Sequence, residues 1–249
     1  MKAMILAAGR GERMRPLTDH TPKPLLEVAG KPLIVWHIEA LAQAGVRDIM
    51  INTAWLGEQL PQRLGSGERF GVTLNYSHEA EAFGGALETA GGVAQVLAWL
   101  AAPDAQGLSD PAFWLVSGDT FLPEFRFDPQ EAARFSASRM QAQLWLAPNA
   151  PHHPHGDFGI DAQGLALSGA EVSPRYTWAS VGLFKHAMFS GIERGTRMPL
   201  RPLLERGIAE RRIGAQLYTG PWIDVGTPER FEQAQALMRL TPSDPPAAA

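Results

Sequence analysis

The sequence contains no cysteine, which excludes disulfide bonds and metal sites built on thiolates. It has no apolar run near the roughly 20 residues that a membrane-spanning helix needs. Charged residues interrupt the apolar start too early for a signal peptide. Basic runs are also missing, and a net charge of −4 argues against a nucleic-acid partner. We therefore expect a cytoplasmic protein without nucleic-acid or membrane partners.

A hexapeptide repeat is absent too, so we expect no β-helical domain. The 249 residues are 45% apolar and 19% charged, which is typical of one domain with a full core. We expect that domain to cover residues 1–240. Residues 241–249 are rich in proline and alanine without periodicity, and this composition predicts a disordered tail.

Apolar segments of two kinds alternate along the chain. Short runs at 4–6, 49–51, 113–116, 144–146 and 181–184 are typical of buried strands, and alternation at 72–76 indicates a further strand. Helical spacing begins after Pro32, and helices are also predicted over 92–102 and from Asp128–Pro129 onward. This order predicts an α/β fold with a doubly wound, mostly parallel sheet. Ligands of such folds bind at the carboxyl ends of the strands.

The first strand leads into a loop that suits an anionic ligand. The segment 6–18 reads LAAGRGERMRPLT, and TPKPL follows at 21–25. Two glycines let backbone N–H groups turn toward anionic oxygens, while Arg13, Arg15 and Lys23 supply positive charge. A dinucleotide fingerprint would need a glycine at Met14, and an NTPase loop would end in Gly-Lys-Ser/Thr. The sequence therefore predicts a phosphate loop of another kind.

Two acids stand where they can face this loop. Asp119 follows the predicted strand 113–116, and Asp224 lies in the short apolar segment WIDVG, ahead of a helix that Thr227 caps. Taken singly, each acid also fits a structural role, Asp119 in a turn and Asp224 as an acid preceding a helix. Their coincidence with Lys23 favours a role in phosphate chemistry.

Together, the loop and the two acids resemble the sugar-phosphate nucleotidyltransferases, which join a nucleoside triphosphate to a sugar 1-phosphate. The resemblance covers LAAGRGERMRPLT, TPKPL, VSGD at 116–119 and WIDVGT at 222–227. It implies a Rossmann-like nucleotidyltransferase fold with a small β lobe on the sugar side. The nucleotide half would span about 1–120 and the sugar-side half about 121–240.

The resemblance also implies roles for single residues. Arg13 and Lys23 would be catalytic, and Asp119 and Asp224 would hold Mg²⁺, although Ser117 stands where the family more often has asparagine. The sugar phosphate would lie near Gly156, Asp157 and Gly182. The nucleotide would contact Leu6, Ala7, Ala8, Gly9, Gly11, Arg13, Lys23, Asn52, Thr89, Ala90 and Gly91.

A histidine-rich segment, PHHPHGDFG at 151–159, invites a metal-site interpretation. Prolines between the histidines prevent them from sharing a helical face, so we expect an extended arm with turns at Gly156 and at 161–164. HHPHGDF, and LETAGG at 87–92, resemble the branch of the family that uses UTP and N-acetylmuramate 1-phosphate. The cations that could read the lactyl carboxylate of that sugar are Arg175, Lys185, Arg197 and Arg201.

The sequence leaves alternatives open. Mannose 1-phosphate guanylyltransferases share much of the same pattern, and another hexose 1-phosphate nucleotidyltransferase is a further alternative. A catalytically silent regulatory subunit could use the same fold, but it would be expected to have lost Lys23, Asp119 or Asp224. The expected partners are UTP, or another nucleoside triphosphate, and a sugar 1-phosphate. The chain could be a monomer or a small homo-oligomer.

Overall fold

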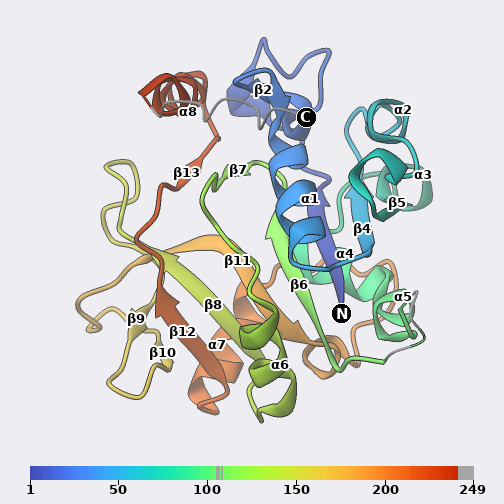
Figure 1. The fold of residues 1–249 in the computed structure, drawn as a ribbon. Coiled ribbons are helices and arrows are strands. Elements are labelled where there is room, and N and C mark those ends of the chain that lie inside the picture. Colours follow the sequence, from blue (N-terminus) through green and yellow to red (C-terminus); the bar gives the residue numbers. More distant parts are fainter. Residues whose placement is uncertain (105–106, 108, 241–249) are drawn as a thin grey trace, which may run out of the picture.

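A computed structural model describes residues 1–104, 107 and 109–240. The tail predicted for 241–249 lies outside the described residues. One seven-stranded sheet forms the centre, in the order β12-β8-β11-β6-β1-β4-β5 (Figure 1). Its strands are β1 (Lys2–Ala7), β4 (Asp48–Thr53), β5 (Thr73–His78), β6 (Ala112–Ser117), β8 (Ala142–Ala147), β11 (Thr177–Lys185) and β12 (Ile213–Leu217).

The sheet is mostly parallel, which confirms the predicted fold class. Strand β1 runs parallel to β4 and β6, β4 to β5, and β12 to β8. Only β11, among these strands, is antiparallel to its neighbours β6 and β8. The carboxyl ends of β1, β4 and β6 therefore meet at one edge of the sheet.

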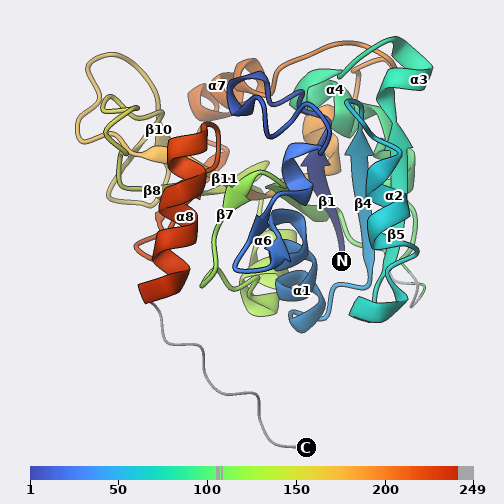
Figure 2. The same ribbon diagram turned by 90° about the horizontal axis from the view of Figure 1, so that it is seen from above.

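Helices cover both faces of the sheet, with α4 and α7 on one side and α1 and α6 on the other (Figure 2). Ile5 and Trp114 pack toward α1 and α6, whereas Met4 and Leu115 pack toward α4 and α7. Because both faces are buried, the strands are apolar without interruption. The helices are α1 (Leu33–Gln43), α2 (Gln59–Leu64), α3 (Glu79–Phe83), α4 (Glu88–Gln95), α5 (Leu97–Ala101), α6 (Pro129–Ala137), α7 (Arg201–Ala209) and α8 (Pro228–Leu240).

The helix predicted over 92–102 differs from the structure. Helix α4 begins earlier, at Glu88, and a break at Val96 separates it from α5. The glycines of LETAGG favour a loop by propensity, but tertiary packing of α4 outweighs that preference. The structure caps α6 with Asp128, whose carboxylate accepts from Gln130 N–H, and the predicted cap Thr227 accepts from Arg230 N–H at 3.4 Å.

Short elements complete the fold around the sheet. The hairpin of β9 and β10 projects beside β8 and β12, and the turn predicted at 161–164 lies at its tip. Within the described residues, no helix is both long and apolar enough to cross a membrane. These short elements are β2 (Glu27–Val28), β3 (Lys31–Pro32), β7 (Thr120–Phe121), β9 (Gly159–Ile160), β10 (Ala166–Leu167), β13 (Ile223–Asp224), η1 (Glu12–Met14), η2 (Lys23–Leu25), η3 (Glu68–Phe70) and η4 (His186–Phe189).

Candidate active site

A cavity of about 300 Å³ opens where β1, β4 and β6 end. In the sheet register Leu6 lies beside both Asn52 and Ser117, so the three strand ends form its floor. The cavity brings together six of the predicted site residues: Leu6, Ala8, Gly9, Asn52, Thr89 and Asp119. Its other lining residues are Ala86, Glu88, Ser117 and Arg197.

The loop after β1 depends on a glycine at one position. Gly11 has φ +67° and precedes η1, and a Cβ there would lie 3.2 Å from the Thr18 methyl group. The Thr18 hydroxyl donates to the Gly11 carbonyl at 2.8 Å, which fixes the turn. The loop is therefore shaped before a ligand arrives, which reduces the entropy lost on binding.

Lys23 lies beside Asp119 at the edge of this cavity. Its side chain is largely buried, and its ammonium forms an ion pair with the Asp119 carboxylate. The Ser117 hydroxyl donates to the same carboxylate at 2.5 Å. Burial alone would raise the pKa of Asp119, but Lys23, followed by the Ser117 hydroxyl and a backbone N–H, holds it below its usual value. Asp119 is therefore ionised at neutral pH.

Asp224 is brought to the same region by a two-stranded ribbon. Strand β13 pairs with β7, which places Asp224 opposite Thr120, and Val225 N–H donates to the Asp119 carbonyl at 3.2 Å. The backbones of the two acids are thus adjacent although about a hundred residues separate them. Asp119 lines the first cavity, whereas Asp224 lines a second cavity of about 370 Å³.

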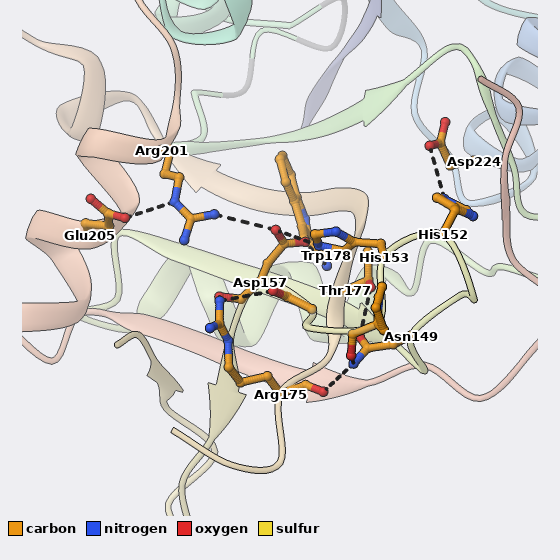
Figure 3. Close-up of polar contacts among 12 residues, drawn as sticks. Asn149, His152, His153, Asp157, Arg175, Thr177, Trp178, Arg201, Glu205 and Asp224 are labelled. Carbon is orange, nitrogen blue, oxygen red and sulfur yellow. Dashed lines mark hydrogen bonds and ion pairs between the residues drawn. The ribbon is translucent and has the colours of Figure 1, made fainter. Parts of the chain in front are cut away.

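The carboxylate of Asp224 accepts a hydrogen bond from Arg230 at 2.7 Å. Arg230, which is only 7% exposed, also donates to His152 Nε2 at 2.6 Å. Figure 3 shows His152 beside Asp224, at 3.9 Å. Burial and the positive charge of Arg230 lower the pKa of His152. His152 therefore accepts from Arg230 as a neutral imidazole.

Arg13 lines the second cavity and not the first. A Cβ on Gly226 would approach the guanidinium of Arg230 to 2.2 Å and that of Arg13 to 3.2 Å, so both arginines lie against this glycine. Sequence reasoning missed Arg230 and His152. The available signal was the arginine six residues after Asp224, but its partner could not be identified before β7 and β13 were paired.

Asp119 and Asp224 were the predicted Mg²⁺ ligands, and their chemistry suits that ion. Mg²⁺ prefers carboxylate oxygens and commonly takes one or two of them, with water and phosphate oxygens as its other ligands. Each acid has a cation partner in the structure, Lys23 or Arg230. Across the described residues no cluster of three or more candidate ligands occurs.

Two further predicted nucleotide contacts, Ala90 and Gly91, lie buried in α4 and do not line the cavity. Gly91 N–H donates to the Met198 carbonyl at 3.0 Å, and a Cβ on Gly91 would lie 2.2 Å from the Thr196 carbonyl oxygen. This glycine therefore permits close packing of α4 against the segment that carries Arg197.

The predicted sugar-side residues lie in neither of the two cavities described here. Gly156 has φ +58°, and a Cβ on Gly182 would lie 2.8 Å from the Gln143 carbonyl oxygen. Asp157 accepts from Trp178 N–H at 2.9 Å and lies 3.5 Å from Arg201 (Figure 3). In the structure, these contacts hold the arm against β11.

The four candidate cations are not equally available to a ligand. Arg175 donates to the carbonyls of Gly156 and Asp157, and Lys185 donates to the Ser136 carbonyl. Arg201 is paired with both Asp157 and Glu205 (Figure 3). Arg197 is 73% exposed, lines the first cavity and pairs with Glu88 at 3.3 Å.

Known proteins resemble the chain over almost its whole length. A family model described as nucleotidyl transferase matches residues 2–239. The N-acetylmuramate alpha-1-phosphate uridylyltransferase of Neisseria meningitidis serogroup B is 46% identical over 95% of this chain and 98% of its own length. Its namesake from Caulobacter vibrioides is 30% identical over 94% of this chain and 95% of its own length.

Proteins named for other sugar phosphates and other nucleotides are also similar to this chain. A mannose-1-phosphate guanylyltransferase catalytic subunit beta from Danio rerio is 42% identical over 93% of this chain, which spans 62% of that protein. A Bacillus anthracis crystal structure bearing the name glucose-1-phosphate thymidylyltransferase superposes with a TM-score of 0.81. It is 22% identical, and the match covers 98% of both chains, which shows a shared fold.

Proposed function

The chain belongs to the nucleotidyl transferase family as a sugar 1-phosphate nucleotidyltransferase, and from this premise we propose that it transfers UMP from UTP to N-acetylmuramate α-1-phosphate. The products would be UDP-N-acetylmuramate and pyrophosphate. The observation that carries the proposal is the 46% identity to the Neisseria uridylyltransferase over nearly the full length of both chains. We further propose that the reaction is cytoplasmic and serves peptidoglycan recycling.

We assign the nucleotide to the cavity at the ends of β1, β4 and β6. Its walls are the loop at Ala8 and Gly9 and the start of α4 at Thr89. Small side chains on both walls let a ligand lie against the backbone, where N–H groups recognise it. This arrangement agrees with the rule that ligands of doubly wound folds bind at the carboxyl ends of strands.

The chemistry needs no protein nucleophile. A phosphate oxygen of the sugar 1-phosphate attacks the α-phosphorus of UTP, and the bond to the β-phosphate bridging oxygen breaks as pyrophosphate leaves. The protein contributes positioning and charge. Lys23 approaches the reacting phosphates from the edge of the cavity, where its ammonium stabilises the charge that develops on the oxygens of the α-phosphate.

Asp119 and Asp224 would hold Mg²⁺, which when bound neutralises phosphate charge. Ser117 fixes the Asp119 carboxylate by a hydrogen bond, and Arg230 does so for Asp224. When Asp119 acts as a ligand, the Lys23 ammonium can turn from the carboxylate toward the phosphates. The ion pair in the structure therefore keeps Lys23 close to the place where it acts.

The proposed sugar carries a carboxylate in addition to its phosphate, and the second cavity suits a carboxylate. N-acetylmuramate differs from N-acetylglucosamine by a lactyl carboxylate. Arg13 and Arg230 both reach the cavity beside Asp224, so two guanidinium groups face one carboxylate there. The surplus positive charge favours a substrate carboxylate, and it makes Arg230 a stronger candidate for reading it than Arg201, which two acids already neutralise.

The test is a competition among muramate, N-acetylglucosamine, glucose and mannose 1-phosphates, each assayed with UTP, GTP, dTTP and CTP. We expect the highest kcat/KM for N-acetylmuramate 1-phosphate with UTP. A preference for mannose 1-phosphate with GTP would replace this proposal by the guanylyltransferase function, which the Danio rerio relative favours. Absence of transfer with every pair would favour a catalytically silent subunit, although Lys23, Asp119 and Asp224 are all present.

A further inference from the structure

A buried hydrogen-bond chain connects the walls of the nucleotide cavity. Asn52, on β4, accepts from Ala7 N–H through Oδ1 at 2.9 Å and donates through Nδ2 to Glu79 Oε1 at 2.8 Å. The other oxygen of Glu79 accepts from Leu87 N–H at 2.7 Å. The chain thus runs from the phosphate loop to the segment just before α4.

The same chain continues to the third wall. The Leu87 carbonyl accepts from Met198 N–H at 3.0 Å, and the Met198 carbonyl accepts from Gly91 N–H at 3.0 Å. The residue between Thr196 and Met198 is Arg197, which lines the cavity. Glu79 is therefore the central link among three segments that meet around one ligand site.

The carboxylate of Glu79 suits this place for a specific reason. The Asn52 amide is oriented by Ala7, so its NH₂ group must point at Glu79, and Leu87 N–H points there too. The two donors point at different oxygens, and only a carboxylate at position 79 places an acceptor at both. Burial raises the pKa of Glu79, while the hydrogen bonds from Leu87 and Asn52 act in the opposite direction.

Gly92, in LETAGG, leaves room for this hydrogen-bond chain. A Cβ on Gly92 would lie 2.8 Å from Glu79 Oε1 and 3.0 Å from Asn52 Nδ2, so a side chain there would push the two groups apart. Glu79 itself is 0% exposed and does not line the cavity. Its effect on a ligand must therefore pass through the positions of Asn52 and Leu87.

We propose that Glu79 is a positioning residue that sets the separation of the two walls of the nucleotide cavity and thereby the affinity for the nucleotide. The proposal rests on the assignment of this cavity to the nucleotide. It goes beyond that assignment because Glu79 touches neither the cavity nor either candidate metal ligand in the contacts described. A change at Glu79 should weaken nucleotide binding without changing the groups that act on the phosphates.

The first test measures the Kd of UTP for wild type and Glu79→Gln, with Mg²⁺ present and sugar phosphate absent. The temperature is kept well below the melting temperatures of the two proteins. The glutamine amide leaves one donor facing another, so Kd should rise about tenfold. In steady state the KM for UTP should rise by a similar factor while kcat changes little. The matched control is Phe135→Leu, a core truncation on α6 that is not part of the hydrogen-bond chain. It should lower the melting temperature but leave the Kd of UTP unchanged.

The second test restores the chain by exchange. In the double variant Asn52→Asp/Glu79→Gln, the aspartate accepts from Ala7 and from the new amide, whose oxygen accepts from Leu87. It should bind UTP at least threefold more tightly than Glu79→Gln, and it serves as the test variant if the single one does not fold. An unchanged Kd in Glu79→Gln, or a double variant that does not fold or binds no better than the single one, would overturn the proposal.

The cavity assignment is tested separately with Gly9→Leu. Gly9 lines the cavity and a Cβ there meets no atom within 4 Å, so a leucine can be accommodated without displacing the loop, and we expect its bulk to abolish UTP binding. If Gly9→Leu binds UTP as wild type does, the assignment of the nucleotide to this cavity is wrong. If Gly9→Leu loses binding but Glu79→Gln keeps it, the assignment stands and only the role of Glu79 is refuted.

Discussion

His37 contacts the segment that carries Asp119, and its protonation should make the free energy of unfolding depend on pH. It lies on α1 at 2% exposure, and its Nε2–H donates to the Thr120 carbonyl at 2.8 Å. Thr120 follows Asp119 directly and pairs with Asp224 in the β7–β13 ribbon. Burial lowers the pKa of His37 to about 4, although the Thr120 carbonyl and the charge of Asp119 oppose the shift.

The sign of the effect follows from the direction of this shift. The unfolded chain takes up a proton at His37 near pH 6.5, whereas the folded chain does so only near pH 4. Acid therefore favours the unfolded chain, and stability falls as the pH decreases from about 6.5 to about 4. The full loss is about 3 kcal/mol, and about 2 kcal/mol of it falls between pH 7 and pH 5.

The assay is urea unfolding of wild type and His37→Gln at pH 7 and pH 5. Glutamine keeps an N–H donor for Thr120 but does not titrate, so the variant should lose about 2 kcal/mol less than wild type over this interval. The exposed His20, changed to glutamine, controls for removal of an imidazole from the surface. Equal pH dependence in wild type and His37→Gln would refute the argument that a neutral, buried His37 is part of the folded state.

Other variants test the chemistry. Asp119→Asn and Asp224→Asn should each lower turnover several hundredfold, on the order of 3–5 kcal/mol, and near wild-type rates at limiting Mg²⁺ would exclude that residue as a ligand. Lys23→Ala should mainly lower kcat, whereas Arg13→Ala, at the second cavity, should raise the KM for the sugar 1-phosphate more than the KM for UTP; steady-state kinetics with the opposite pattern would contradict this division. Arg230→Met should reduce kcat/KM for N-acetylmuramate 1-phosphate more than for N-acetylglucosamine 1-phosphate, and an unchanged ratio would remove Arg230 from sugar recognition.

The parts of the fold that local sequence determines were predictable. Runs such as 113–116 are apolar on both faces because helices cover both sides of the sheet, and their alternation with helical patterns predicts parallel pairing. The loop after β1 was also predictable, because glycines, prolines and cations at close spacing leave few other structures. Leu6, Ala8 and Gly9 accordingly line a cavity at the sheet edge.

Contacts between distant segments were not predictable in the same way. LETAGG looks like a loop because glycine disfavours helix, yet Gly91 and Gly92 lie in α4, where a Cβ would strike Thr196 or Glu79. Arg230 became a partner of Asp224 and His152 only through the pairing of β7 with β13. Sequence spacing contains no direct record of such pairings, so both the role of Arg230 and the chain through Glu79 required the structure.

The two acids share an arrangement that explains how a polyanionic substrate can be accepted. Asp119 is paired with Lys23 and Asp224 with Arg230, and both cations are largely buried. A buried charge without a partner is costly, so each of these cations needs its acid before substrates arrive. If Asp119 holds a metal ion as proposed, Lys23 would be free to pair with substrate phosphates. On the proposed mechanism, removal of Lys23 would have two consequences, because Asp119 would lose its partner in the free enzyme and the phosphates would lose theirs in the transition state.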